Sequence, residues 1–222
     1  MCWLIGWLLD FLYPPTCPHC GRPVKEQGAW CPSCLDKVLD IRFLQADQLE
    51  DLDGLWILGR YQGGLRSLIH DVKFNGKSSQ AACIGPLLSA FDPAHCLRHI
   101  NLVLPIPISQ AKRQVRGYNQ VDLFFKEWVQ NRADYYNWQW FDILIKETSQ
   151  GDMWHMSQLE RKRHVDKLFT IKKEYLPALE GKELLLVDDI YTTGATLVAA
   201  AHLLRQAGAK TVYGLTLASG TR

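Results

Sequence analysis

Residues 183–197, which read ELLLVDDIYTTGATL, decide the fold because they join an apolar run, two acids and a run of small residues. Residues 184–187 are all apolar, which is typical of a parallel strand covered on both faces. Asp188 and Asp189 follow at the point where we expect this strand to end. A helical pattern begins at Leu197, so the stretch predicts a strand, a loop and a helix of an α/β domain.

The loop between the acids and the helix has the composition of a phosphate site. It offers small or hydroxyl-bearing side chains: Thr192, Thr193, Gly194, Ala195 and Thr196. Backbone N–H groups at a helix N-terminus lack partners within the helix and carry partial positive charge, so they bind anions. The two carboxylates suit the vicinal hydroxyls of a ribose, directly or through Mg²⁺. The plainer alternative is an acidic strand end followed by a polar turn.

Residues 187–196, VDDIYTTGAT, resemble the phosphoribosyl pyrophosphate (PRPP) loop of type I phosphoribosyltransferases. In that family the two acids hold the ribose hydroxyls and the TTGAT segment surrounds the 5'-phosphate. The resemblance implies an α/β fold whose parallel sheet is flanked by helices, with Asp188 and Asp189 as catalytic acids. It also implies that PRPP binds to ten consecutive residues: Val187, Asp188, Asp189, Ile190, Tyr191, Thr192, Thr193, Gly194, Ala195 and Thr196.

Composition limits the other possibilities. With 222 residues, of which 47% are apolar, the chain can bury one core of ordinary size and carry a small additional module. The net charge is only +2, so anion binding has to come from local clusters of basic residues. A GxGxxG dinucleotide fingerprint is absent from the sequence.

Two CxxC pairs form the second strong signal. Four thiolates come within reach of one tetrahedral Zn²⁺ at this spacing, those of Cys17, Cys20, Cys31 and Cys34. Four ligands close the coordination shell, so we expect the metal to be structural. Disulfides are the alternative, and they are disfavoured in a cytoplasmic chain because thiols stay reduced there.

Residues 1–13, MCWLIGWLLDFLY, are apolar but too short to span a bilayer, and they contain Asp10. They also lack the basic start and the small-residue cleavage site of a signal peptide. We therefore expect a cytoplasmic protein without integral membrane association. An amphipathic helix packed on the body is the favoured role of this segment, and peripheral membrane contact is the alternative.

We expect two domains: an apolar helix and zinc-ribbon module in residues 1–53, and a phosphoribosyltransferase-like domain in residues 54–222. Residues 35–53 read as an acidic, weakly patterned connector. Beyond them, periodicity predicts strands at residues 56–61, 101–106 and 211–217, and helices at residues 65–72, 79–91, 121–128 and 197–208.

Basic residues follow the strand predicted at residues 101–106. Pro107 marks its sharp exit, and Arg113 and Arg116 come soon afterwards. Parallel strands end at one edge of an open sheet, so these cations should meet Asp188 where such sheets bind ligands. We assign Pro107, Arg113 and Arg116 to the pyrophosphate.

Residues 146–169 are polar and become basic toward their end. We interpret them as a flap whose Arg161 and Arg163 close over the pyrophosphate, since its charge needs cations and exclusion of water. A solvated helix face is the alternative.

The order of the motifs is similar to that of the ComF family. CPxCG pairs, LPIPIS, RGYNQ at residues 116–120, MSQLERKRH and VDDIYTTGAT follow one another as in that family. The resemblance implies a role in natural competence and DNA uptake. The chain departs from the family pattern at His164, where asparagine is usual, and at Gln150, whose spacing differs; both changes would shift or weaken the flap. Purine-salvage enzymes carry an acid at the position of Thr192, so purine bases are disfavoured and the acceptor is unidentified.

Two functions fit this sequence. The first is a Mg²⁺-dependent phosphoribosyltransferase that binds PRPP or another ribose phosphate, and in which positioning and charge stabilisation do most of the catalysis. The second is a non-catalytic competence protein that binds single-stranded DNA on the same fold. Its bases would stack on Tyr135, Tyr136, Trp138 and Trp140, and its phosphates would lie on Lys112, Arg113 and Arg116. Core packing is the ordinary role of such aromatic residues, and the oligomeric state stays open.

Overall fold

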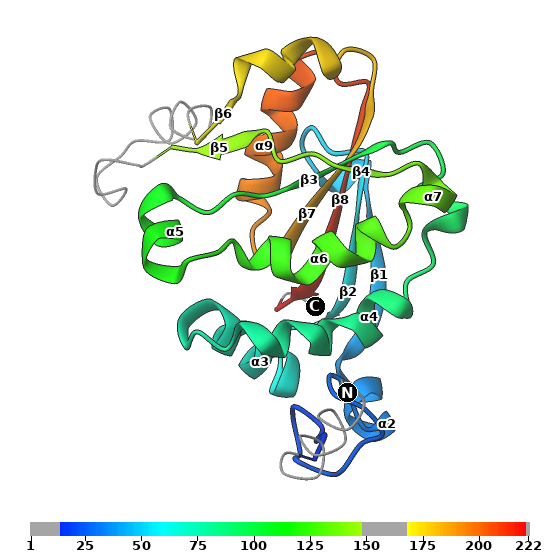
Figure 1. The fold of residues 1–222 in the computed structure, drawn as a ribbon. Helices are drawn as coiled ribbons and strands as arrows, with labels where there is room; N and C mark the ends of the chain where they lie inside the picture. Colours follow the sequence, from blue (N-terminus) through cyan, green and yellow to red (C-terminus); the bar gives the residue numbers. More distant parts are fainter. Residues whose placement is uncertain (1–13, 148–167, 221–222) are drawn as a thin grey trace.

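The computed structural model describes residues 14–147 and 168–220. The apolar segment 1–13 and the basic part of the expected flap, including Arg161, Arg163 and His164, lie outside the described residues. Within the described ranges, no helix has both the length and the apolar character needed to cross a bilayer. These ranges form a sheet with helices on both faces and a small N-terminal module at one end (Figure 1).

Six strands form the main sheet, in the order β1-β2-β8-β7-β3-β4. Their bounds are Leu39–Gln45 (β1), Gly54–Arg60 (β2), Leu102–Pro105 (β3), Gln139–Trp140 (β4), Glu183–Tyr191 (β7) and Thr211–Ser219 (β8). The five strands from β2 to β4 are parallel, as predicted. The edge strand β1 pairs antiparallel with β2, so the sheet is mixed.

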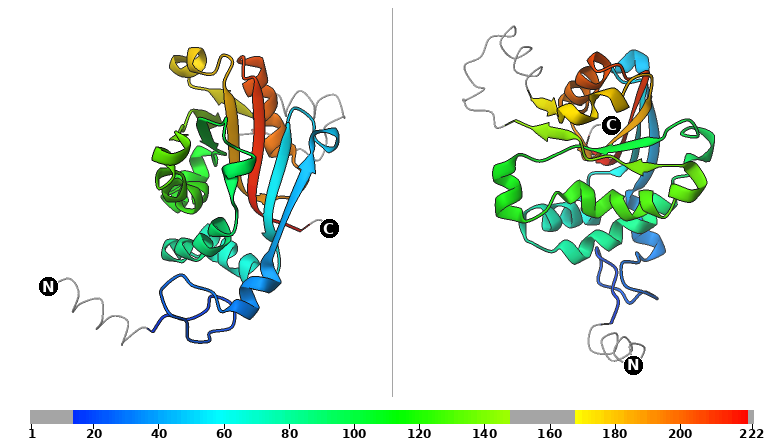
Figure 2. Two further views of the ribbon diagram at one scale, coloured as in Figure 1. Left: turned by 90° about the vertical axis from the view of Figure 1, so that its right-hand side faces the viewer. Right: turned by 45° about the horizontal axis from the view of Figure 1, so that its top comes forward.

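Helices cover both faces of this sheet (Figure 2). One face carries α3 (Gly63–Phe74), η2 (Ser78–Ile84), α4 (Gly85–Ser89) and α6 (Gln120–Gln130). The other face carries α9 (Ala195–Gln206), η5 (Lys173–Ala178) and a hairpin of β5 (Leu144–Lys146) and β6 (Phe169–Ile171). Short helices complete the connections: η1 (Ala46–Gln48), η3 (Pro93–His95), α5 (Gln110–Arg116) and α7 (Ala133–Tyr136).

Most of the predicted helices are confirmed by their buried faces. In α3 the apolar positions at helical spacing are all buried: Leu65, Leu68, Ile69 and Val72. Residues 79–91, predicted as one helix, form η2 and then the short α4. Pro86 lies in the first turn of α4, where its missing N–H has no partner to lose, so the α-helix starts there rather than passing through it.

The N-terminal module packs on the first turns of α3. α2 (Pro32–Val38) begins inside the second cysteine pair. The buried indole of Trp30 donates a hydrogen bond to the carbonyl oxygen of Cys83 at 2.7 Å. His19 lies directly against Gly64 of α3, where an added Cβ would be 2.4 Å from the Cβ of His19. The cysteines therefore share one core with α3.

The boundary expected between residues 53 and 54 would divide the main sheet. Residues 35–53 are not a weakly patterned connector, because they contain most of α2, all of β1 and η1. β1 pairs with β2, and the carboxylate of Asp53 accepts a hydrogen bond from the backbone N–H of Val212 in β8 at 2.7 Å. We therefore propose that the sheet domain begins at Leu39.

Candidate functional site

A cavity of about 410 Å³ lies at the carboxyl ends of β3 and β7, two neighbouring parallel strands. The chain continues from β3 to β4 on one side and from β7 to β8 on the other, so the cavity lies at a topological switch point. Its volume falls in the range of small-molecule sites. The polar residues that line it include Lys73, Lys112, Arg116, Gln120, Lys146, Asp188, Asp189, Thr192 and Thr196.

The acid pair lies within β7, and not after it as the sequence pattern predicted. β7 continues to Tyr191, and Asp188 still pairs with Thr216 of β8. Successive side chains of an extended strand point to opposite faces. Asp189 therefore shares the face that α3 and α6 cover, and Asp188 shares the face of α9 and the β5–β6 hairpin. The two acids consequently have different surroundings.

Asp189 is almost completely buried, with 3% of its surface exposed. The ammonium group of Lys73 in α3 lies 2.8 Å from each of its carboxylate oxygens. The side-chain amide of Gln120, at the start of α6, donates to Oδ2 at 2.8 Å. One buried carboxylate thus joins a helix, a strand and a second helix, and both of its oxygens already have partners.

Asp188 is only partly buried and faces the other side of the sheet. Its Oδ1 accepts a hydrogen bond from the backbone N–H of Asp189 at 2.8 Å. Burial and the negative charge of Asp189 raise the pKa of Asp188 to about 8. Lys146 of β5 lines the same cavity, and burial lowers the pKa of its ammonium group. Asp188 can therefore exchange a proton near neutral pH.

The segment RGYNQ, residues 116–120, connects Asp189 to Arg116, which lines the same cavity. Arg116 donates a hydrogen bond to Oε1 of Gln120, whose amide holds Asp189. The Tyr118 hydroxyl donates to the carbonyl oxygen of Val72 at 2.6 Å, next to Lys73. Hydrogen bonds from this motif therefore hold Gln120 and the end of α3, which carries Lys73, beside Asp189.

The backbone between β7 and α9 turns at Gly194. Its φ of 78° is left-handed, and an added Cβ would lie 2.8 Å from the ring of Tyr191. This turn places the first turn of α9 at the cavity edge, because α9 starts at Ala195 and Thr196 lines the cavity. The turn and the start of α9 therefore lie at the edge of the cavity, and phosphate binding by this loop stays a prediction.

The ten residues assigned to the PRPP loop fall into separate places. Five line the cavity: Asp188, Asp189, Ile190, Thr192 and Thr196. Three line a neighbouring cavity of about 390 Å³: Tyr191, Thr193 and Ala195. Val187 lies in the core, and Gly194 forms the turn. Half of the ten residues therefore line the first cavity, and the other half lie in the second cavity, the core or the turn.

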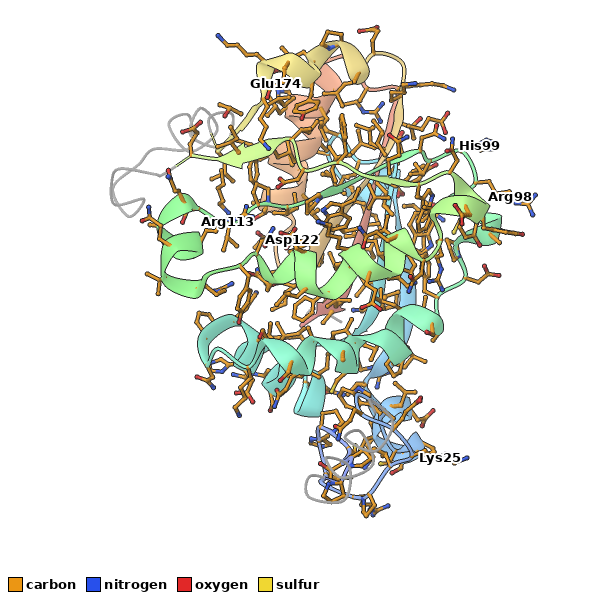
Figure 3. All side chains as sticks on the ribbon, viewed as in Figure 1. Lys25, Arg98, His99, Arg113, Asp122 and Glu174 are labelled. Carbon is orange, nitrogen blue, oxygen red and sulfur yellow. The ribbon has the colours of Figure 1, made fainter. Side chains whose placement is uncertain are left out.

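Arg116, one of the arginines expected to bind the pyrophosphate, lines the cavity. Pro107 and Lys112 line it too. Arg113 belongs to the same helix, α5, but it does not contribute to the lining within the described part of the chain. Figure 3 shows Arg113 on the side of α5 that faces Asp122. Burial and the charge of Asp142 raise the pKa of Asp122, and the positive charge of Arg113 offsets part of this rise. The structure therefore assembles part of the predicted basic cluster.

Three residues of the site did not stand out in the sequence: Lys73, Gln120 and Lys146. Lys73 and Gln120 come from elements that follow other strands, and Lys146 from a short hairpin strand. The signal for Gln120 was its place in RGYNQ, whose purpose only the contact with Asp189 explains. For Lys73 the sequence shows only a lysine at a helix end.

The four cysteines form a compact cluster. Their Sγ atoms all lie within 4.8 Å of one another, and those of Cys20 and Cys31 are 3.6 Å apart. This distance is far longer than the ~2.05 Å of a disulfide and near the ~3.8 Å that four sulfurs around Zn²⁺ at 2.3 Å require. Four thiols in this arrangement fit a structural zinc ion and leave no open coordination position.

The aromatic residues expected to stack on single-stranded DNA lie near the amino-terminal end of β3, and the expected cations follow its carboxyl end. β4 starts beside Asn101, ahead of β3, whereas Lys112 and Arg116 come after β3. Figure 3 shows the same separation between Arg98 and His99 at one end and Arg113 at the other. Trp138 is 2% exposed and packs between Trp128 and Tyr136. Tyr136 and Trp140 are partly buried against the same core, whereas Tyr135 is 76% exposed. The four aromatics lie at the opposite end of the strands from Lys112 and Arg116.

Two family models match parts of the chain. A model of the double zinc ribbon domain matches residues 8–43, and a model of the phosphoribosyl transferase domain matches residues 142–221. Fold and cysteine cluster together define the class: a phosphoribosyltransferase-like α/β protein with an N-terminal four-cysteine zinc ribbon.

Proteins that are similar over nearly the whole chain show which family within this class the chain belongs to. DNA utilization protein YhgH of Shigella flexneri is 30% identical over 88% of this chain and 80% of its own length. Competence protein F of Haemophilus influenzae is 27% identical over 92% of this chain and 85% of its own length. Competence protein ComFC of Bacillus subtilis is 28% identical over 90% of this chain and 76% of its own length. The chain belongs to the ComF family.

Proposed function

We propose that this chain binds PRPP in the cavity at the ends of β3 and β7 and acts as a phosphoribosyltransferase in a competence or DNA-utilization process. The observation that carries the proposal is the convergence of three parts on one cavity. A helix N-terminus with Thr192 and Thr196 suits the 5'-phosphate, Asp188 suits the ribose, and Arg116 with Lys112 suits the pyrophosphate.

Transfer would break the bond between C1' and the pyrophosphate oxygen and form a bond from C1' to an acceptor nucleophile. The residues of this chain would hold the sugar and stabilise the charge on the departing pyrophosphate. Mg²⁺ carried by the pyrophosphate would supply further positive charge on that side. The proposal concerns the donor site and leaves the acceptor open.

Titration calorimetry of the purified protein with PRPP and Mg²⁺ tests this proposal. Replacing Asp188→Ala removes the hydrogen bonds of its carboxyl group in either protonation state, each worth about 1.5 to 3 kcal/mol when charged. The affinity for PRPP should fall at least about tenfold. Asp134→Ala, an exposed acid of α7 at the other edge of the sheet, is the matched control. Undetectable PRPP binding by the parent protein would refute the proposal.

Binding of single-stranded DNA is a second candidate, on a different surface from the one expected. A cavity of about 420 Å³ adjoins the first and shares Lys73, Phe74, Lys112 and Arg116 with it. Phe74 is 68% exposed there, and the Arg116 guanidinium lies 5.6 Å from its ring centroid. Exposed aromatic rings beside cations suit stacked bases and their phosphates.

The same preparation separates the two candidates. Phe74→Ser should weaken oligonucleotide binding about tenfold, since stacking contributes roughly 1 to 3 kcal/mol per base. Asp188→Ala should leave oligonucleotide affinity equal or higher, because it removes negative charge near the phosphates. If Phe74→Ser leaves the oligonucleotide affinity unchanged, this surface is excluded as the DNA-binding site.

A further inference from the structure

A separate cavity lies between the first turn of α9 and the segment that follows η1. Its volume is about 390 Å³, which is in the range of small-molecule sites. We call it the side cavity, and its lining consists of Gln48, Leu49, Glu50, Tyr191, Thr193, Ala195 and Val198. None of these residues lines the cavity proposed for PRPP, so the two cavities are distinct.

The wall of the side cavity that residues 48–53 form is anchored to α9. His202 donates a hydrogen bond from Nδ1 to Oδ2 of Asp51 at 2.8 Å, since an ionised carboxylate can only accept. Arg205, one turn further along α9, forms an ion pair with Asp53. These contacts hold the segment alongside the helix. The side cavity is therefore preformed, as small-molecule sites usually are.

The negative charge in the side cavity has no counter-charge from the protein. The carboxylate of Glu50 has no hydrogen bond or ion pair among the residues that the structure describes, whereas Asp51 and Asp53 have basic partners on α9. No residue of the lining is basic. The start of α9 contributes about half a positive charge, which is less than the full charge of Glu50. A ligand with one positive charge would therefore complement this cavity.

The rest of the lining suits a short apolar body. Leu49 and Val198 supply aliphatic surface from the two walls, and Tyr191 supplies an aromatic side chain. Aromatic rings attract organic cations to their faces. The Tyr191 ring also covers the turn of the loop, because an added Cβ at Gly194 would lie 2.8 Å from it. A ligand against Tyr191 would thus contact the residue that packs on this turn.

We propose that the side cavity binds a small primary amine, whose ammonium group pairs with Glu50 and whose apolar part packs between Tyr191 and Val198. The amine is an effector of the loop between β7 and α9, because this loop borders both cavities. This inference is separate from the proposed function, since it requires neither PRPP nor group transfer.

The order of residues along the loop explains how the two cavities are connected. Thr192 lines the first cavity and lies between Tyr191 and Thr193, which line the side cavity. Thr196 lines the first cavity and directly follows Ala195, which lines the second. A ligand that fixes the side-cavity residues therefore also restricts the backbone of their neighbours.

The probe that tests this inference is 2-phenylethylamine, and 2-phenylethanol is its uncharged control of the same shape. Both are titrated into the zinc-loaded parent protein at constant ionic strength, and binding is followed by the NMR shifts of backbone amides. The amine should bind about fivefold more tightly than the alcohol, which is the effect of one partly screened ion pair. Equal affinities for the two compounds would overturn the inference.

The same spectra locate the bound amine. The amide signals of Thr193 and Ala195 should shift on titration, and those of Thr192 and Thr196 should shift by a smaller amount. Shifts confined to residues 48–50 would show that the occupant does not act on the loop, and the effector role would be wrong.

A pair of exposed acids provides the matched variants. Glu50→Gln keeps the shape of the side chain and removes its charge, so it should weaken amine binding about fivefold and leave the affinity for the alcohol unchanged. Asp47→Asn changes an exposed acid of η1 outside the lining, and it should bind both compounds as the parent does. Both positions are exposed, so both variants should fold as the parent does.

Two results from these variants would contradict the inference. An amine affinity that is unchanged in Glu50→Gln would show that Glu50 does not hold the ammonium group. Equal weakening in Glu50→Gln and Asp47→Asn would show that the amine is attracted by the general negative charge of this surface and has no defined site.

Discussion

The cysteine cluster and the acid cavity are built in opposite ways. The cluster takes all four ligands from residues 17–34, at spacings that a short loop can close. The cavity joins Lys73 to Asp189 across 116 residues and Gln120 to Asp189 across 69. The first can form as soon as a metal binds, whereas the second exists only once the sheet and its helices have assembled. Local order and long-range order therefore support two different kinds of site.

Removal of zinc should destabilise the protein more than any change in the acid cavity. Metal binding contributes on the order of 10 kcal/mol to small zinc modules, and Cys34→Ser removes a buried ligand. We expect loss of the metal, measured by elemental analysis, and faster amide exchange in α2 and the first turns of α3, which share a core with the cysteines. Exchange in β7 should change little.

Cys96→Ser is the matched control for that experiment, because Cys96 lies outside the cluster and is only partly buried. It should keep one zinc ion per chain and change the free energy of unfolding by less than about 1 kcal/mol. A full zinc content in Cys34→Ser would show that the four cysteines are not the ligands. Equal protection loss in β7 and α3 would show that module and cavity unfold together.

The two acids should differ strongly in their effect on folding. Asp189→Asn leaves the Lys73 ammonium group without its buried partner, so we expect a loss of about 2 kcal/mol in the free energy of unfolding, somewhat reduced by the exposure of Lys73. Asp188→Asn removes a charge that burial disfavours and should cost nothing at pH 8. Urea denaturation of both variants measures the difference, and equal losses would contradict the division of roles.

The contrast between local and long-range contacts also explains which features the sequence alone could predict. The apolar run before Asp188, the glycine before α9 and the CxxC spacings each concern neighbours in the chain, and the structure confirms the elements they predict. The partners of Asp189 come from helices after β2 and β3, so no local pattern could name them. The extension of β7 through the acids depends on pairing with β8, which is again a long-range contact.

Gly194 and Gly117 offer a finer comparison, because both have left-handed φ values, 78° and 82°. An added Cβ at Gly117 meets no atom within 4 Å, whereas at Gly194 it lies 2.8 Å from the Tyr191 ring. Gly117→Ala should therefore cost about 1 kcal/mol from backbone strain, and Gly194→Ala roughly 1 kcal/mol more. Adding Tyr191→Ala to each variant should remove only the extra part at Gly194. Equal costs for the two glycines would mean that the ring moves freely aside.

The smallest expected effect is the change in stability between pH 7 and pH 8. The folded state keeps a proton on Asp188 up to about pH 8, whereas the unfolded chain loses it near pH 3.9, so unfolding releases a proton in this window. Stability should therefore fall as pH rises from about 4 to 8 and level off above it. Between pH 7 and 8 the loss from this group should be about 1 kcal/mol.

Asp188→Asn isolates this contribution from the histidines and cysteines that titrate in the same range. The charges that act on Asp188 are those of Asp189, which raises its pKa, and of Lys73 and Lys146, which lower it. All three remain in Asp188→Asn, so the difference between parent and variant from pH 6 to pH 9 belongs to Asp188. We expect the variant to be more stable than the parent by an amount that grows with pH up to about 8. A constant difference would show that Asp188 is already ionised at pH 6, and Asp188 would then bind the ribose hydroxyls as an acceptor only.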